Sequence, residues 1–309
     1  MNGRVVLVGG SGKIGRALAH VLDADGADVV VLSRDPARAR RKGDLGHLVA
    51  WSPGRPAELA TDLDGAHAVV NLAGVPVGPW PWWIPGRRNA IMRSRIGTTR
   101  AIVDAIGRLP VDRRPRVLVS ASGTDSYEGR DEMPATEDTP FSGGFLSEVC
   151  RAWEEEARRA TALGVRVAIV RNGFVLARGA PVLAIYALPF RIRLGGPLGD
   201  GRQWMSWIHI DDVVGLFRLA IEDERVAGPI NAVSPEPARQ AQVAGAIAAA
   251  LGRRSWLPVP APLIRLALGE AAVLPLGSRR VVPARAADLA YAFRWTDLRA
   301  AIADVLVAR

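Results

Sequence analysis

The sequence predicts an α/β protein in which helices cover both faces of a doubly wound parallel sheet. Short apolar runs alternate with segments of helical periodicity through the first half of the chain, as expected where central parallel strands are joined by crossover helices. A glycine-rich turn directly follows the first apolar run. The chain has 309 residues, 49% of them hydrophobic, which is enough to bury a large core.

The first strand is expected at residues 5–8, which are all apolar. The helix after it carries its apolar residues on one face and has Gly26 as its C-cap. Later strands are expected at 29–32, 68–72, 116–120, 165–170 and 229–234, with helices around 91–107 and 145–162 and a strand end followed by a helix across 208–226.

The strand–helix alternation breaks up after residue 173, where prolines and glycines become frequent. We therefore expect residues 1–173 and about 206–234 to form the sheet domain. The remaining segments, about 174–205 and 235–309, would form a smaller substrate-binding lobe. This lobe is expected over the C-terminal edge of the strands, where ligands bind in such sheets.

The composition argues against several classes of protein. Net charge is +9, but all basic residues except Lys13 and Lys42 are arginines, and they are scattered rather than gathered in a nucleic-acid patch. No apolar stretch is long enough for a membrane span and no leader is recognisable. The single cysteine, Cys150, excludes an internal disulfide, and no residue cluster has metal-ligand spacing. We expect a cytoplasmic monomer or homodimer with a small-molecule substrate.

Residues 9–15, GGSGKIG, fall between the first strand and its helix. Glycines at 9, 12 and 15 allow a tight turn, a close approach to pyrophosphate and close helix–strand packing, and the helix start favours phosphate. An empty glycine turn is the structural alternative. The pattern predicts a Rossmann-type dinucleotide site made by Gly9, Gly10, Ser11, Gly12, Lys13, Ile14 and Gly15.

The end of the second strand favours NADP(H) over NAD(H). Ser33 and Arg34 can bind a 2′-phosphate, whereas a carboxylate there would repel it. Asp35 is followed by Pro36, a pair typical of a helix N-cap and first turn, so we assign Asp35 to capping. Arg34 as a solvated surface charge is the alternative.

Two other strand ends carry candidate cofactor contacts. Small residues close the strand expected at 68–72 and let the backbone approach a cofactor, although an ordinary turn has the same composition. Asn172, just beyond the strand ending at Val170, is a plausible amide contact. The candidates are Asn71, Leu72, Ala73, Gly74 and Asn172.

These residues resemble the short-chain dehydrogenase/reductase superfamily in its extended form, and more specifically its atypical "epimerase family protein" branch. The stretch GGPLGDGRQWMSWIHIDDVVGL at 195–216 carries the resemblance most strongly, supported by SRIGTTRAIVDAI at 94–106 and FLSEVCRAWE at 145–154. The resemblance implies a Rossmann fold with a small C-terminal substrate lobe.

The superfamily's usual chemistry uses a tyrosine with a lysine four residues later. This chain has no lysine after Lys42, and the two positions fall on Leu146 and Cys150, so that pair is excluded. By the resemblance, Ser122 matches the substrate-bonding serine, and Tyr127 remains from a motif with two tyrosines. We assign Ser122 and Tyr127 as catalytic candidates, with packing as the equal alternative for Tyr127.

Several residues are candidates for substrate contact, each with a structural alternative. Trp80, Trp82 and Trp83 form an aromatic lid or pack inside the protein. Cys150 lines the pocket or is a small buried hydrophobe. Arg202 binds an anionic group or is a surface charge. His209 acts in acid–base chemistry or bonds locally beside a helix start capped by Asp211.

Three functions follow from these observations. The first is an NADP(H)-dependent reductase or epimerase for a small carbonyl or enone substrate, aromatic or polycyclic substrates included. The second is a non-catalytic NADP(H)-binding sensor or partner-binding protein. The third is an enzyme of cyclisation or dehydration that retains NADP(H) without a net redox step.

Overall fold

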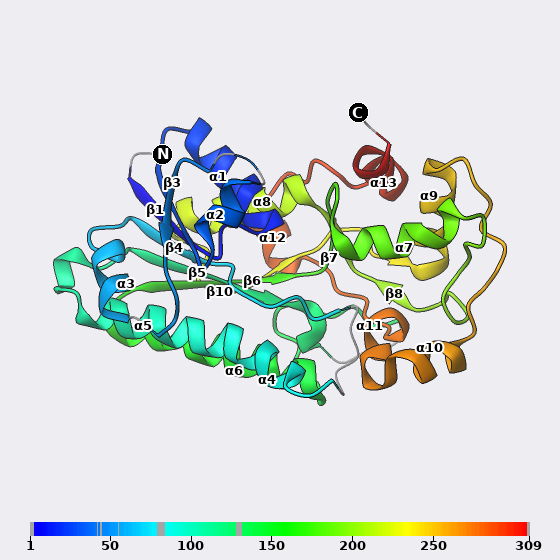
Figure 1. Cartoon of the computed structure of the whole chain (residues 1–309), viewed down its shortest axis with the longest axis horizontal. Coiled ribbons are helices and arrows are strands. Elements are labelled where there is room, and N and C mark those ends of the chain that lie inside the picture. The colour runs from blue at the N-terminus through cyan, green and yellow to red at the C-terminus, as the bar shows by residue number, and fades with distance from the viewer. Residues whose placement is uncertain are drawn as a thin grey trace.

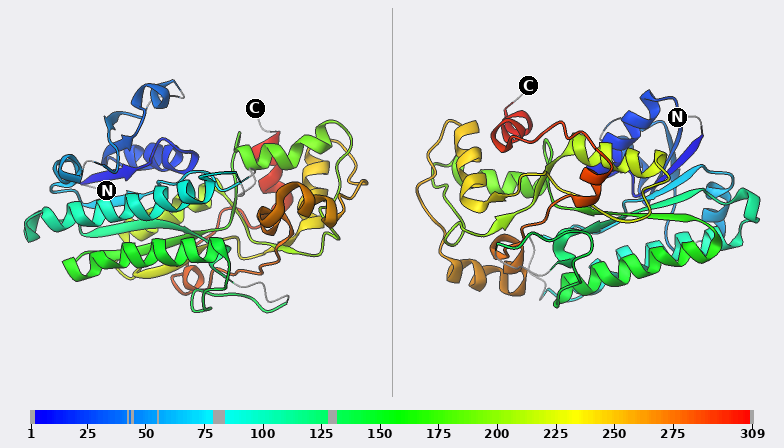
Figure 2. Two further views of the ribbon diagram at one scale, coloured as in Figure 1. Left: turned by 60° about the horizontal axis from the view of Figure 1, so that its bottom comes forward. Right: turned by 180° about the vertical axis from the view of Figure 1, so that it is seen from behind.

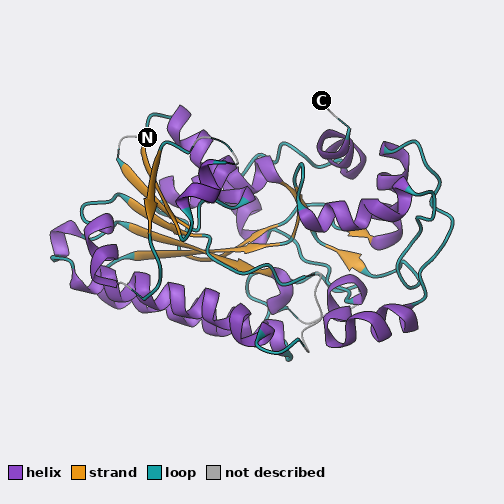
Figure 3. Ribbon diagram, in the orientation of Figure 1, coloured by secondary structure: helices purple, strands orange, loops and turns teal. Residues whose placement is uncertain are grey.

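The computed structural model describes residues 3–41, 43, 45–54, 56–78, 84–127 and 132–307. It confirms the predicted class, because a parallel seven-stranded sheet of order β10-β6-β5-β4-β1-β2-β3 lies between layers of helices (Figures 1 and 3). The strands of this sheet are β1 (Arg4–Val8), β2 (Asp28–Ser33), β3 (His47–Ala50), β4 (Ala68–Asn71), β5 (Val117–Gly123), β6 (Arg166–Asn172) and β10 (Gly228–Ala232).

The strands are apolar on both faces because helices cover both faces. Helices α1 (Lys13–Ala24) and α8 (Ile210–Glu222) cover one face, with Leu18 and Phe217 in its core. The other face is covered by α3 (Pro56–Leu63), α5 (Thr98–Arg108) and α6 (Phe145–Arg158), with Leu59, Ile102 and Ala157 in its core. The left view of Figure 2 shows α5 and α6 running side by side in front of the sheet.

The strand order reverses at β1, which lies between β2 and β4. In such sheets the loops that leave the C-terminal ends on either side of the reversal diverge and leave room for a ligand. Val8 pairs with Asn71 in the register of β1 and β4, so the glycine turn after β1 lies beside the turn after β4. The sheet therefore brings together two segments that are 60 residues apart in the sequence.

A smaller lobe lies beyond the C-terminal edge of the strands (Figure 1). Its core is formed by helices packed around two short strand pairs, β7 with β9 and β8 with β11. Its elements are β7 (Phe174–Leu176), α7 (Pro181–Arg191), β8 (Trp204–Met205), β9 (Trp207–His209), β11 (Ala238–Arg239), α9 (Gln240–Ala250), α10 (Ala261–Leu268), α11 (Val273–Leu276) and α13 (Leu298–Leu306).

Parts of the chain depart from the predicted division. The sequence analysis did not anticipate β3 or α3, whereas α2 (Pro36–Arg40) begins where the Asp35–Pro36 pair predicted a helix start. Residues 207–209 pair with β7 and join the two parts, since Trp207 lies in the lobe core and Ile208 in the core of the sheet domain. Conversely, the segment around α12 (Ala284–Asp288) returns to the sheet domain, where Tyr291 and Phe293 pack on its core. Among the described helices, none combines the length and apolar character needed to cross a membrane.

Candidate functional site

The glycine turn after β1 is shaped by two close approaches. Gly9 has φ +76°, and a Cβ there would lie 2.8 Å from the backbone nitrogen of Ala73. A Cβ on Gly15 would lie 2.4 Å from the Cα of Gly10, so α1 can approach the turn only with glycine at this position. Gly12 is different, because the nearest atom to its Cβ would be the Gly9 oxygen at 3.6 Å. Its outer side is therefore free for a ligand.

The start of α1 is suited to phosphate. No side chain caps this helix, which leaves N–H groups of its first turn, around Lys13 and Ile14, available to an anion. Arg16 donates from Nε to the Ser11 backbone oxygen at 3.1 Å and so stabilises the turn. The sequence analysis did not identify this residue. Lys13 donates from Nζ to the Arg178 oxygen at 2.9 Å, so it links the turn to the segment that precedes α7.

The end of β2 presents hydroxyl and guanidinium groups without a free carboxylate. Ser33 donates from Oγ to the Ser11 Oγ at 3.4 Å, which places both hydroxyls beside the glycine turn. Asp35 caps α2 by accepting from the Arg38 nitrogen at 2.8 Å, with Pro36 in the first turn, which confirms the capping role predicted for it. Arg34 is exposed. An arginine at this position can accommodate a 2′-phosphate.

The buried side chain of Asn71 stabilises the turn after β4. Asn71 is fully buried, and it donates from Nδ2 to the Thr99 Oγ1 at 2.8 Å and accepts from the Ala73 nitrogen at 3.2 Å. Its side chain thus shapes the turn through Leu72, Ala73 and Gly74, and the turn's backbone, rather than the Asn71 amide, is what can face a cofactor. Gly74 faces a guanidinium, because its Cβ would lie 3.1 Å from the Cζ of Arg95.

A cleft of about 600 Å³ separates the sheet edge from the lobe. Thr124 and Asp125, which follow β5, line its inner end together with Asn172 from β6 and Arg279 from the lobe. Asp125 Oδ1 lies 3.4 Å from Arg279 Nη1. The Asn172 Nδ2 donates to two backbone oxygens at 3.2 Å, but its Oδ1 is buried without a hydrogen-bond partner in the described part of the chain. Asn172 can therefore accept a hydrogen bond from a ligand.

The walls of the cleft come from the lobe and are largely apolar. They are formed mainly by Val182, Ile185, Pro189 and Phe190 of α7, Ala244 and Ile247 of α9, and Ile264, Leu268, Ala271 and Leu274 of α10 and the segment after it. One wall residue, Tyr186, carries a hydroxyl to which the described residues offer no hydrogen bond, and burial raises its pKa to about 12. Its ring packs on Phe174, two residues beyond Asn172, with centroids 5.3 Å apart.

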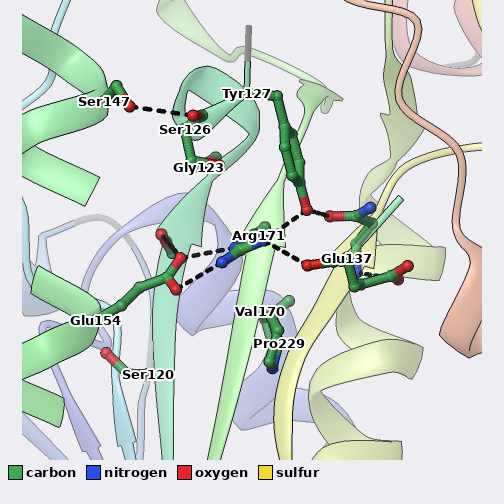
Figure 4. A network of polar contacts seen from close by, with 12 residues as sticks. Ser120, Gly123, Ser126, Tyr127, Glu137, Ser147, Glu154, Val170, Arg171 and Pro229 are labelled. Atoms are coloured by element: carbon green, nitrogen blue, oxygen red, sulfur yellow. Dashed lines mark hydrogen bonds and ion pairs between the residues drawn. The ribbon is translucent and has the colours of Figure 1, made fainter. Parts of the chain in front are cut away.

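Tyr127 lies in a buried polar network rather than in this cleft (Figure 4). Its side chain is 0% exposed; its hydroxyl donates to the Asn231 Oδ1 and accepts from Arg171 Nη1, both at 2.7 Å. Arg171 also forms a bidentate salt bridge with Glu154, in which Nε donates to Oε1 at 2.7 Å and Nη2 donates to Oε2 at 2.8 Å. Burial raises the pKa of Tyr127 to about 12. The geometry favours packing, the alternative left open by the sequence, over contact with a substrate.

Ser122 belongs to the same network. It is 5% exposed, and its Oγ donates to the Glu154 Oε1 at 2.8 Å. The geometry argues against a catalytic role for Ser122 and Tyr127, because both hydroxyls are hydrogen-bonded to internal partners and neither residue lines the cleft. The loop between them, at Thr124 and Asp125, reaches the cleft instead.

Cys150 is buried, and burial raises the pKa of its thiol to about 12, helped by the carboxylates of Asp125 and Glu154. This favours the buried-hydrophobe alternative over a substrate contact, because a neutral thiol is a weak nucleophile. A cation nevertheless lies in this neighbourhood. Arg95 donates from Nη1 to the Val75 oxygen at 3.0 Å and stacks on Trp153, and burial lowers its pKa. It follows α4 (Arg87–Met92) in a π-helical turn at Arg93–Gly97.

The remaining candidates fall elsewhere. Arg202 is exposed and lines a different hollow of about 810 Å³ within the lobe, together with Arg239 and Arg265. His209 is buried and caps α8 by accepting from the Asp211 nitrogen, so the cap is His209 and not Asp211, and its role is local. Trp80, Trp82 and Trp83 lie outside the described residues. The described residues contain no cluster of metal-ligating side chains.

Family models match two parts of the chain. Residues 5–232 match the NAD dependent epimerase/dehydratase family, and residues 259–305 match a domain of unknown function, DUF1731. The chain is 36% identical over 98% of its length to an Arabidopsis thaliana protein named epimerase family protein SDR39U1 homolog, chloroplastic, covering 86% of that protein. It is 32% identical to the Bacillus subtilis epimerase family protein YfhF, covering 99% of this chain and 98% of that protein.

Solved structures agree with this result. The human epimerase family protein SDR39U1, crystallised with NADPH, superposes with a TM-score of 0.85 at 32% identity, and 98% of each chain is covered. A nucleoside-diphosphate sugar epimerase from Corynebacterium glutamicum superposes with a TM-score of 0.78 at 32% identity, covering 99% of this chain and 58% of that one. These matches confirm the predicted resemblance and fold.

Proposed function

The chain belongs to the NAD dependent epimerase/dehydratase family, and we propose that it is an NADP(H)-dependent reductase or epimerase acting on a carbonyl or enone compound. The observation that carries this proposal is the position of the cleft. Its inner end is built from residues that follow β5 and from the last residue of β6, on the edge of the sheet that also carries the glycine turn. A dinucleotide bound on the glycine turn would extend along this edge.

The residues present fit NADP(H). Gly12 leaves its outer side open and α1 starts without a capping side chain, which suits a pyrophosphate. Ser11, Ser33 and Arg34 would hold the 2′-phosphate, since Asp35 is engaged as a helix cap. The human relative crystallised with NADPH supports this choice of cofactor. When bound, NADPH supplies a hydride for reduction.

The chain's own residues would then polarise the substrate. In place of Ser122 and Tyr127 we assign the hydrogen-bond donor to Tyr186, whose hydroxyl has no hydrogen-bond partner among the described residues. Its raised pKa keeps it protonated, so it can donate to the oxygen of a carbonyl as negative charge develops there. The Asp125–Arg279 pair and the Asn172 Oδ1 would orient the same end of the substrate.

Cofactor preference tests this proposal. We expect the protein to bind NADPH at least tenfold more tightly than NADH, about 1.4 kcal/mol, as one charge-assisted phosphate contact provides. Arg34→Ala should remove most of that difference and leave NADH affinity unchanged. Calorimetric titration of both cofactors checks this. Equal affinities in the unmodified protein, or an NADH preference, would refute the assignment of Arg34.

One observation supports a second candidate, a non-catalytic NADP(H)-binding protein. The superfamily's lysine position is held by Cys150, whose thiol is buried, and Tyr127 is locked in a structural network. NADPH binding without turnover of any carbonyl compound would favour this alternative.

A further inference from the structure

The cleft separates polar from apolar groups along its length. Thr124, Asp125 and Asn172 come from the sheet edge and gather at one end. The walls built from α7 on one side and from α10 with the segment after it on the other consist of aliphatic side chains, prolines, Phe190 and Tyr186. The other lining residues include Trp204, Met205 and two polar side chains, Ser206 and Gln240, which are hydrogen-bonded to the backbone of the lobe. A ligand that fills the cleft must therefore be polar at one end and apolar along its body.

Charge argues against a phosphorylated substrate. Arg279 is the only basic residue among the cleft-lining residues that the structure describes, and it is already paired with Asp125 at 3.4 Å. Arg279 also donates from Nε to the Tyr127 oxygen at 3.1 Å, which fixes its position. A diphosphate placed in this cleft would lose its hydration without gaining a free cation.

The outer part of the cleft stays apolar up to the surface. Val182 and Ile185 line it from α7, and each remains 41% exposed. Apolar side chains left open at the rim of a cleft indicate a surface that a ligand covers. A substrate whose hydrocarbon part reaches these two residues would cover them and exclude water from them. A short polar molecule would leave them exposed to water.

We propose that the substrate is an amphiphilic carbonyl compound. Its hydrocarbon body, a long chain or fused rings, lies between α7 and α10, and its oxygen lies at the end formed by Asp125, Asn172 and Tyr186. This inference rests on the proposed function for the reacting end only, since the binding of the hydrocarbon body follows from the cleft itself.

A homologous series of 2-alkanones, from 2-hexanone to 2-dodecanone, tests the inference by calorimetry on the full chain with and without NADPH. Each added methylene should tighten binding roughly fourfold, as burial of one methylene provides, until the chain emerges at the mouth. UDP-glucose serves as the phosphorylated comparison. We expect it to bind at least tenfold more weakly than 2-dodecanone.

Two substitutions on the same helix form a matched pair. Ile185→Asp places a charge on the cleft wall and should weaken 2-dodecanone binding at least tenfold, while binding of 2-hexanone and NADPH is unchanged. Leu188→Asp is the control, because Leu188 is 55% exposed on α7 and does not line the cleft. It should change none of the affinities. Both side chains are exposed, so neither variant threatens folding.

The outcomes separate the two proposals. Affinity that does not grow with chain length, UDP-glucose binding more tightly than 2-dodecanone, or equal losses in Ile185→Asp and Leu188→Asp would each overturn the amphiphilic substrate. Retained chain-length dependence in a protein that does not bind NADPH would overturn the proposed function and leave the substrate class standing.

Discussion

At the scale of single residues, internal partners decide which polar groups can act on a ligand. Tyr127 and Ser122 are both near the sheet edge, but Arg171, Asn231 and Glu154 occupy their hydroxyls. A buried network of this kind is stable because each charge has several partners, and removing one partner leaves an uncompensated charge behind. We propose Tyr186 and Asn172 for the chemistry because, among the described cleft-lining residues, each has hydrogen-bonding capacity that no internal partner uses.

A pair of tyrosine variants tests this distinction. Tyr186→Phe should lower kcat roughly 10–1000-fold with little change in NADPH affinity, the range for losing one transition-state donor. Tyr127→Phe should leave kcat within about threefold but lower the free energy of unfolding by about 1–3 kcal/mol, because Arg171 and Asn231 lose a buried partner. Turnover of 2-dodecanone, followed by NADPH absorbance, and urea unfolding measure these effects. A large kcat loss in Tyr127→Phe alone would return catalysis to that residue.

At the scale of elements, the glycines of the turn after β1 have different tasks. Gly15 permits α1 to pack against Gly10, whereas Gly12 faces open space. We expect Gly12→Val to fold normally and to lose dinucleotide binding, because the valine occupies the phosphate position. Gly15→Val should instead destabilise the protein, since its Cβ alone would overlap Gly10.

Circular dichroism, thermal unfolding and NADPH titration of both variants check this division. Gly15→Val should lower the unfolding temperature, whereas Gly12→Val should lower the affinity for NADPH and leave the unfolding temperature unchanged. Normal NADPH affinity in Gly12→Val would mean that the turn is structural only.

At the scale of the whole molecule, Lys13 connects the cofactor turn with the lobe. Its Nζ donates to the Arg178 oxygen just before α7, the helix that forms one cleft wall. NADPH bound at the turn should therefore stabilise α7 through this contact, because a ligand stabilises the segments that it orders. In the unmodified protein we expect NADPH to slow amide exchange at residues 181–191 about tenfold or more, and in Lys13→Met much less.

Amide exchange is measured at saturating NADPH, so that a lower NADPH affinity of Lys13→Met cannot account for faster exchange in α7. The amides of α5 provide the internal control. Equal protection of α7 in both proteins would show that the Lys13 contact does not couple the two parts.

The sequence alone predicted the class of fold and NADP(H) as the cofactor, and both are confirmed; the residues that would hold the cofactor stay a prediction. Apolar runs and helical periodicity are local signals, and they predicted the strands of the sheet except for the short β3. The glycine turn and the pair Ser33–Arg34 are equally local, because a few adjacent residues build each of them. The absence of lysine beyond Lys42 excluded the usual tyrosine–lysine pair by sequence alone.

Only the tertiary structure decided which residues line one cleft. Tyr186, Asp125 and Arg279 are far apart in the sequence and line the same cleft because the lobe lies beyond the C-terminal edge of the sheet. Whether a hydroxyl is free depends on its partners in space, and no sequence pattern indicated that Arg171 and Asn231 occupy Tyr127. Arg202 and Arg279 are both arginines of the lobe, but only packing places Arg279 in the cleft and Arg202 outside it.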